Sequence, residues 1–154
     1  MKTYKQRLLD NLRNDTYCRL GVSNLQGVGV FAIKEIPKGV NPFKKTYIDT
    51  TPQIDITDED LEGIDENVAK CVKDFFAKDE FQSYPVSLNG LNCLDISFYV
   101  NHSNDPNLTI NEKSPQFDQY SPFVATRLIK EGEELTQDYV ELYNNDPSQF
   151  KEIR

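Results

Sequence analysis

Apolar residues recur at helical spacing at the start of the chain. Tyr4, Leu8, Leu9 and Leu12 fall on one side of a helix with 3.6 residues per turn. The pattern therefore predicts a short amphipathic helix within residues 1–16, ahead of the main domain. We expect its apolar side to pack against that domain.

Between residues 17 and 36 the pattern changes to that of short β-strands. Leu20 and Val22 alternate with other residues, and Val28 and Val30 repeat the alternation after a break that contains Asn and Gly. Further short apolar runs, separated by Asn, Gly and Pro, lie around Val86–Leu88, Leu94–Ile96, Phe123–Ile129 and Leu135. The chain is therefore predicted to be mainly β.

One longer segment, Thr57–Phe76, departs from the β pattern. Thr57 and Asp60 have the spacing of a helix N-terminal cap, while Gly63 is placed to divide the segment and Asp65 to cap its second part. We therefore expect a helical insert at about residues 57–78. The apolar residues that follow one another at helical spacings of three or four are Leu61, Ile64, Val68, Val72, Phe75 and Phe76.

The composition is that of one folded domain. The 154 residues are 38% hydrophobic, with 9 Phe and 8 Tyr, which suffices for a core and is too aromatic for a disordered chain. A net charge of -8 disfavours nucleic-acid binding through phosphate contacts and favours a basic partner. No apolar run approaches the roughly 18 residues that a membrane span needs, so we expect a soluble intracellular protein, in the cytoplasm or the nucleus.

The cysteines indicate neither a metal cluster nor a disulfide framework. Cys18, Cys71 and Cys93 are odd in number and too far apart for the spacing of a zinc site. A reducing compartment suits them, and no metal site is predicted.

Three segments carry candidate chemistry, although each also has a plain structural explanation. Gly27–Gly29 lets the backbone approach a ligand closely, and equally suits an ordinary hairpin turn. Tyr99–Asn107 holds the only histidine among several turn-forming residues, and a lone histidine is more often structural than catalytic. Gly132–Tyr139 is typical of a turn and a strand that ends on Asp-Tyr, where the tyrosine is equally suited to the core.

In this order and spacing, the three segments resemble the SET-domain family of protein lysine methyltransferases. The resemblance covers about Cys18–Tyr139. It implies a SET-domain fold of small β-sheets at residues 17–142, preceded by the helix of residues 1–16, followed by a tail at 143–154 and closed by a C-terminal pseudoknot. The matching motifs are Gly27-Val28-Gly29-Val30-Phe31-Ala32, Asn101-His102-Ser103 with Pro106-Asn107, and Phe123–Arg127 with Glu133–Tyr139.

The resemblance also implies a reaction, the transfer of a methyl group from S-adenosyl-L-methionine to the side-chain amine of a protein lysine. In the family the methionine part of this cofactor lies against the backbone that here is Gly27, Val28 and Gly29. Asn101 and the His102 backbone would hold the cofactor, so His102 is expected to be structural rather than a base.

Tyr139 matches the catalytic tyrosine of the family. The wall of the substrate channel is expected to include Tyr84, Phe98 and Tyr99, because these aromatic residues lie near the motifs in sequence. Many members carry an aromatic residue two positions past the catalytic tyrosine, where this chain has Glu141, and Tyr143 is the expected substitute.

The chain resembles the compact form of the family. No cysteine cluster precedes the matched region or follows Tyr139, so the tail would have to close the channel. The expected partner is a lysine-containing protein, such as a histone or another basic protein. A non-catalytic SET-fold module that binds a basic peptide remains the alternative.

Overall fold

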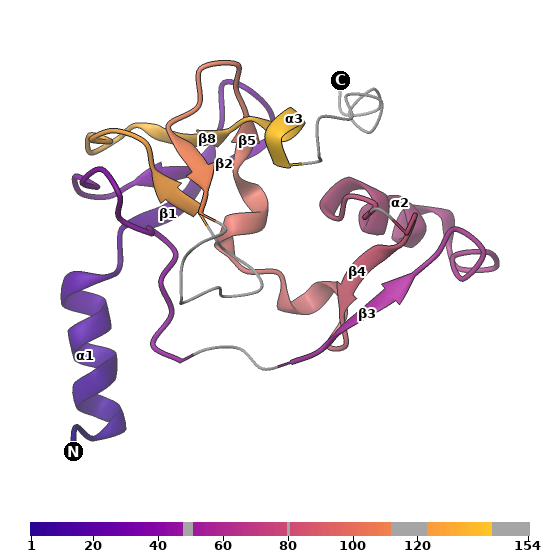
Figure 1. Ribbon diagram of the computed structural model, residues 1–154, viewed down its shortest axis with the longest axis horizontal. Coiled ribbons are helices and arrows are strands. Elements are labelled where there is room, and N and C mark those ends of the chain that lie inside the picture. The colour runs from indigo at the N-terminus through magenta and orange to yellow at the C-terminus, as the bar shows by residue number, and fades with distance from the viewer. Residues whose placement is uncertain (48–50, 80, 112–122, 143–154) are drawn as a thin grey trace. The chain divides into compact units, whose positions relative to one another are not determined.

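The computed structural model describes residues 1–47, 51–79, 81–111 and 123–142, and consists of small β-sheets with few helices (Figure 1). The chain divides into two compact units. We call the first, Met1–Asp49 with Ile96–Asp138, the sheet unit, and the second, Thr50–Asp95 with Tyr139–Arg154, the insert unit. Among the described residues, no helix has the length and apolar character needed to cross a bilayer.

The sheet unit begins with helix α1 (Tyr4–Asn14), as the apolar spacing predicted. Its N-terminus carries a capping box, in which Thr3 Oγ1 accepts from the Gln6 backbone N–H and the Gln6 side chain accepts from that of Thr3. The expected packing of its apolar side is confirmed only in part, because the ring centroid of Tyr4 lies 5.9 Å from that of Tyr47 and Leu9 is half-buried. No residue of α1 is buried, and the exposed apolar residues are Tyr4, Leu8 and Leu12.

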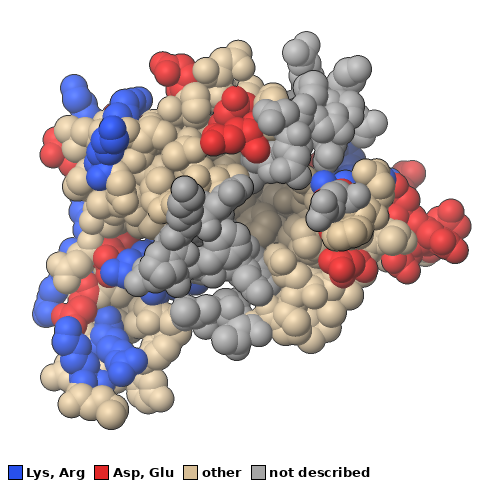
Figure 2. Space-filling model, in the orientation of Figure 1, with Lys and Arg blue, Asp and Glu red and all other residues tan. Residues whose placement is uncertain are grey.

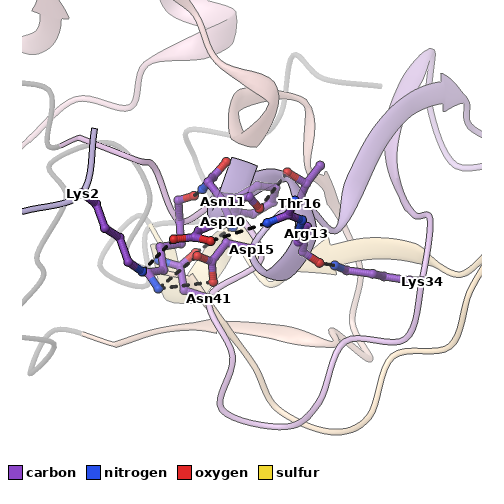
Figure 3. A network of polar contacts seen from close by, with 10 residues as sticks. Lys2, Asp10, Asn11, Arg13, Asp15, Thr16, Lys34 and Asn41 are labelled. Atoms are coloured by element: carbon purple, nitrogen blue, oxygen red, sulfur yellow. Dashed lines mark hydrogen bonds and ion pairs between the residues drawn. The ribbon is translucent and has the colours of Figure 1, made fainter. Parts of the chain in front are cut away.

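Polar contacts hold the C-terminal end of α1 instead, as Figure 3 shows. Lys34 donates from Nζ to the carbonyl of Arg13 at 3.1 Å, and the hydroxyl of Thr16 donates to the carbonyl of Asn11 at 3.3 Å. Asn11 also donates from Nδ2 to the carbonyl of Lys44 at 3.1 Å. A helix that is tied at one end by such contacts can leave part of its apolar side in solvent, which explains why Tyr4, Leu8 and Leu12 stay exposed.

A four-stranded sheet with the strand order β1-β2-β8-β5 forms the centre of the sheet unit. Strand β1 (Cys18–Val22) pairs with β2 (Val28–Ala32), and β2 pairs with β8 (Glu134–Gln137), both antiparallel. The short β5 (Asn101–His102) pairs with β8 in parallel. The last strand among the described residues therefore lies between strands from the beginning and the middle of the chain. The predicted strands at Leu20–Val22, Val28–Val30 and Leu135 are confirmed.

The two faces of this sheet differ in character. Val30 lies opposite Leu135, and both are fully buried, whereas Phe31 lies opposite Glu134. Because side chains alternate along a strand, Leu135 faces the core and Glu134 faces the other side, together with Phe31 and Gly29. The other fully buried large apolar residues in the described part of the sheet unit are Ile36, Val100, Leu108 and Ile129.

Asn107 anchors β8 through its side chain. Its Nδ2 donates to the carbonyl of Glu134 at 2.8 Å, and its Oδ1 accepts from the backbone N–H of Thr136 at 2.9 Å. The side chain, on a residue only 3% exposed, therefore pairs two backbone groups of β8. Directly after Asn107 the chain enters β6 (Leu108–Ile110), which pairs with β7 (Phe123–Ala125), so the expected strand at the start of Phe123–Ile129 is confirmed.

The strand expected at Leu94–Ile96 is wrong. The chain there forms two 3₁₀ turns, η1 (Leu91–Cys93) and η2 (Ile96–Tyr99), and Gly90 enters the first with a φ of 72°. The Leu94 backbone N–H closes η1 by donating to the carbonyl of Leu91 at 3.3 Å. Apolar periodicity cannot separate so short a run from a buried turn.

The helical insert expected at about residues 57–78 is confirmed only in part, because residues 58–63 form turns and the chain is helical only at Glu66–Phe75. Thr57 and Asp60 bond reciprocally through side chain and backbone, and the turn ends at Gly63, whose φ is 81°. Asp65 then caps helix α2 (Glu66–Phe75). A two-stranded sheet of β3 (Gln53–Ile56) and β4 (Tyr84–Ser87) lies in the same unit, as does helix α3 (Tyr139–Leu142). The alternation of short apolar runs did not reveal β3.

Asp58 connects the turn of the insert unit to the end of its helical segment. It accepts hydrogen bonds from Lys78 and from Lys73, the latter at 2.9 Å, and from the hydroxyl of Tyr84 at 3.3 Å. The hydrogen bonds from Lys78 and Lys73 lower the pKa of Asp58 from 3.8 to about 2. The carboxyl group of Asp58 is therefore ionised at neutral pH.

We expect Asp58→Asn to lower the free energy of unfolding at pH 7 by less than about 1 kcal/mol, because Asp58 is half exposed and its ion pairs are screened. Since the folded pKa lies below the unfolded one, the contribution is present above about pH 3.8 and disappears as the pH falls toward 2. Urea unfolding at pH 7, 4 and 2.5 measures the difference. A difference that grows on acidification would contradict this account.

We expect Asn107→Ala to lower the free energy of unfolding by about 2–4 kcal/mol, because it leaves two backbone groups of β8 without their partner. Asn24→Ala, at an exposed position in the β1–β2 turn, is the matched control and should change stability by less than about 0.5 kcal/mol. Urea denaturation of both variants provides the measurement. Equal midpoints for the two variants would show that Asn107 does not anchor the strand.

Candidate functional site

The first motif forms the turn between β1 and β2. The Ser23 backbone N–H donates to the carbonyl of Gly27 at 3.0 Å, and Ser23 Oγ accepts from the backbone N–H groups of Leu25 and Gln26 at 2.9 and 3.2 Å. Gly27 adopts a φ of 50°, which favours glycine. The motif is therefore a hairpin turn, and the carbonyl groups of Gln26 and Val28 accept hydrogen bonds from Asn101.

Asn101 is the residue to which those carbonyl groups point. Its Nδ2 donates to the carbonyl of Gln26 at 3.0 Å and to that of Val28 at 3.2 Å, and also to Oε1 of Glu134 at 2.8 Å. Three acceptors around one nitrogen fix the orientation of the amide, because its oxygen would be repelled there. The structure thus brings together Asn101 and the expected cofactor-binding segment Gly27–Gly29.

Gly29 provides the space for this arrangement. A Cβ atom at this position would collide with Oε1 of Glu134 and lie 2.8 Å from its Cδ. The carboxylate therefore rests directly on the backbone of β2. We use the name acceptor cluster for the carbonyl groups of Gln26 and Val28 and the carboxylate of Glu134, together with the residues that donate to them, Ser23 and Asn101.

His102 follows Asn101 at the end of β5 and is only part-buried. Its Nε2 lies 3.2 Å from Oδ1 of Asn104, and its Nδ1 lies 3.8 Å from Oδ1 of Asp138. Its backbone belongs to the parallel pair with β8, opposite Gln137. The ring thus lies among polar neighbours, and the structural role expected of His102 stays a prediction.

Tyr139 begins helix α3, directly after Asp138. Burial raises the pKa of its hydroxyl to about 12. The side chain is therefore a neutral phenol at physiological pH, able to donate or accept a hydrogen bond but not to serve as a base.

The expected channel residues lie in different parts of the chain. Phe98 and Tyr99 are in η2 of the sheet unit, and Tyr84 is in β4 of the insert unit, where it is buried and bonded to Asp58. Tyr143 lies outside the described residues. Grouping of these four residues in one channel therefore stays a prediction.

Three residues of interest were missed from the sequence. Glu134 and Ser23 belong to the acceptor cluster, and the only signal for Glu134 was a carboxylate inside an otherwise buried strand. The third is Gln137, which is 6% exposed and whose Oε1 is buried without a hydrogen-bond partner among the described residues. A buried oxygen of this kind is a ready acceptor for a ligand N–H or a water molecule.

This arrangement fits a ligand with a donor-rich cationic group. The cluster presents carbonyl and carboxylate oxygens beside a glycine backbone, and the Asn101 amide keeps its Oδ1 for a further donor. Within the described part of the chain, no group of three or more His, Cys, Asp or Glu side chains is placed to hold a metal ion. An ammonium-bearing organic cofactor suits these residues.

Comparison with known proteins gives one match at the level of families. The family profile described as SET domain matches residues 27–140. That stretch contains Gly27–Gly29, Asn101 and Tyr139. A search of curated proteins finds no significant match.

Solved structures give further similarities. A candidate histone methyltransferase of Plasmodium falciparum is 21% identical, with a TM-score of 0.48, over 80% of this chain and 93% of that one. A humanized mutant of the Chaetomium thermophilum Polycomb Repressive Complex 2, bound to an inhibitor, is 22% identical, with a TM-score of 0.51, over 88% of this chain. This chain spans only 16% of that protein's length, and the similarity concerns the fold alone.

We expect Tyr139 to ionise only near pH 12, because burial disfavours the phenolate. Subtracting the alkaline absorbance titration of Tyr139→Phe from that of the unsubstituted chain isolates this group. Between pH 10 and 12 the unfolded chain ionises this tyrosine and the folded chain does not, so the folded state loses stability there, and Tyr139→Phe removes this loss. A difference titration centred near pH 10 would contradict the burial of the hydroxyl.

Proposed function

We propose, on the premise that this chain belongs to the SET-domain family, that it transfers the methyl group of S-adenosyl-L-methionine to the side-chain amine of a protein lysine. Members of this family are typically protein lysine methyltransferases. The observation that carries the proposal is the extent of the match, which covers residues 27–140 and so includes Gly27–Gly29, Asn101 and Tyr139. S-adenosyl-L-methionine is the methyl donor that members of this family typically use.

The acceptor cluster supports a place for the amino-acid end of the cofactor. An ammonium group has three N–H donors, which suit the carbonyl oxygens of Gln26 and Val28 and the Oδ1 of Asn101. The Gly27-Val28-Gly29 backbone would lie along the methionine part, and Asn101 with the His102 backbone would hold the cofactor. No metal takes part in this proposal.

The lysine has to react as a neutral amine. Deprotonating a free lysine at pH 7 costs about 4.6 kcal/mol, because its ordinary pKa is about 10.4. When bound, the cofactor supplies a methyl group on a positively charged sulfur, which is a good leaving group. A water-poor aromatic channel disfavours the ammonium form, and we propose Tyr84, Phe98, Tyr99 and Tyr143 for its wall.

Tyr139 is proposed as the catalytic tyrosine. With its pKa raised to about 12, the hydroxyl keeps its proton and cannot remove one from the lysine. Its role is therefore to orient the amine through a hydrogen bond, while the lysine proton leaves to water before the transfer. His102, with its polar neighbours Asn104 and Asp138, is assigned a structural role.

A basic protein is the proposed substrate, such as a histone. Residues 51–79 contain nine Asp or Glu against three Lys, and Figure 2 shows acidic side chains gathered over the insert unit. The resemblance implies that, in the SET-domain family, such an insert helps to shape the substrate groove. An acidic surface there would attract a lysine-rich segment.

We further propose that the fold closes as a C-terminal pseudoknot. Strand β8 lies between β2 and β5, and the side chain of Asn107 bonds β8 beyond the end of β5. This arrangement supports a knot in which the segment that contains β8 passes beneath the chain between β5 and Asn107. The proposed domain spans residues 17–142.

The test is transfer of label from methyl-labelled cofactor to a lysine-rich protein mixture. We expect Tyr139→Phe to reduce transfer by about a hundredfold, since it removes one hydrogen bond at the reacting centre. Cofactor affinity, measured by calorimetry, should stay within about threefold. Tyr4→Phe, an exposed tyrosine outside the matched residues, is the control and should leave transfer unchanged.

Two outcomes would contradict the proposal in different ways. Cofactor binding without transfer to any protein would sink the enzymatic part. Absence of any heat on titration with the cofactor would favour the alternative, a non-catalytic SET-fold module that binds a basic peptide. Full activity of Tyr139→Phe would remove only the role assigned to that residue.

A further inference from the structure

One carboxylate connects three parts of the sheet unit that are far apart in the sequence. Oε1 of Glu134 accepts from Asn101 Nδ2 at 2.8 Å, and Oε2 accepts from Ser23 Oγ at 2.9 Å. The β1–β2 turn, β5 and β8 therefore meet at Glu134. Its place on the backbone of Gly29 puts it beside the segment proposed to hold the methionine part of the cofactor.

Both neighbours of this carboxylate are hydrogen-bond donors. Ser23 Oγ already accepts from two backbone N–H groups, so its own proton is directed to Glu134. Asn101 presents Nδ2, because the same nitrogen bonds the carbonyl of Gln26. A carboxylate accepts at both oxygens, whereas a glutamine amide has one accepting and one donating end. Only an ionised acidic side chain satisfies both neighbours.

We infer that Glu134 is a positioning residue for the cofactor, an inference that rests on the proposed function. By accepting from Nδ2, Glu134 fixes the Asn101 amide with Oδ1 turned away from the two carbonyl groups. That oxygen then accepts from the ammonium group of the cofactor. The residue thus acts on the amino-acid end of the ligand and not on its adenosine end.

The opposite arrangement follows from a neutral amide at this position. A glutamine at 134 that satisfies Ser23 with its oxygen turns its NH₂ group toward Asn101. The Asn101 amide would then flip, so that Oδ1 faces the carbonyl oxygens of Gln26 and Val28 and Nδ2 faces the cofactor ammonium. Both new contacts are repulsive.

The experiment is a calorimetric titration of the full chain with two ligands. S-adenosylhomocysteine carries the ammonium group, and its desamino analogue lacks it. We expect Glu134→Gln to weaken binding of the first about tenfold, as for loss of a hydrogen bond to a charged group, and to leave the second unchanged. Glu133→Gln, the same charge change one residue earlier, alters an exposed pair with Arg127 and should affect neither ligand.

A double-mutant cycle distinguishes the proposed clash between two N–H donors, at Glu134→Gln and Asn101, from a general loss of structure. In the Ser23→Ala background the glutamine can turn its oxygen to Asn101, so Glu134→Gln should have a clearly smaller effect there than in the unsubstituted chain. Additive effects would overturn the inference. So would equal loss for both ligands, or unchanged affinity of Glu134→Gln for S-adenosylhomocysteine.

Two further results are interpreted separately. If Glu134→Gln does not fold, as judged by thermal unfolding, Glu134→Asp provides the same comparison, because its shorter side chain cannot reach both donors. Loss confined to the ammonium-bearing ligand supports the inference, and unselective loss overturns it. If the unsubstituted chain binds neither ligand, the proposed function itself fails, and the role of Glu134 fails with it.

Discussion

Strand β8 needs hydrogen-bond partners along both of its edges, and this requirement shapes the rest of the sheet unit. Strand β2 pairs with one edge, but β5 pairs with only two residues of the other, Thr136 and Gln137. The side chain of Asn107 provides partners for the backbone at Glu134 and Thr136. Unpaired buried backbone groups are costly, so the chain between β5 and Asn107 has to turn back on itself, which its Asn, Asp and Pro residues permit.

The pleat of the same strand separates stability from the proposed binding. Leu135 contributes to the core with Val30, while its neighbour Glu134 lies on the polar face with Asn101. Burial of a leucine side chain stabilises the fold by about 2–3 kcal/mol, and this contribution does not depend on any ligand. The buried apolar residues therefore hold the polar face in position. The residues of the polar face do not themselves have to stabilise the fold.

Local signals in the sequence predicted local structure well. The caps at Thr57 and Asp65 are hydrogen bonds between residues two or three positions apart, and Gly63 between them adopts a positive φ. Such local features can be recognised in the sequence. The packing of α1 could be predicted only in part, because its apolar side chains do not reveal whether a partner surface exists. The motifs placed Asn101 beside Gly27–Gly29 only through family resemblance. Glu134 and Ser23 escaped notice because their bond joins residues 111 positions apart.

That sequence separation has a consequence for how the protein is made. During synthesis from the N-terminus, the β1–β2 hairpin can form early, but its outer edge stays open until residues 134–137 have left the ribosome. The ligand-facing side of the sheet therefore assembles last, from contacts of high sequence separation, which fold slowly. Until then the free edge of β2 is exposed to pairing with other chains. A nascent or truncated chain that ends before β8 would hold a hairpin but no acceptor cluster.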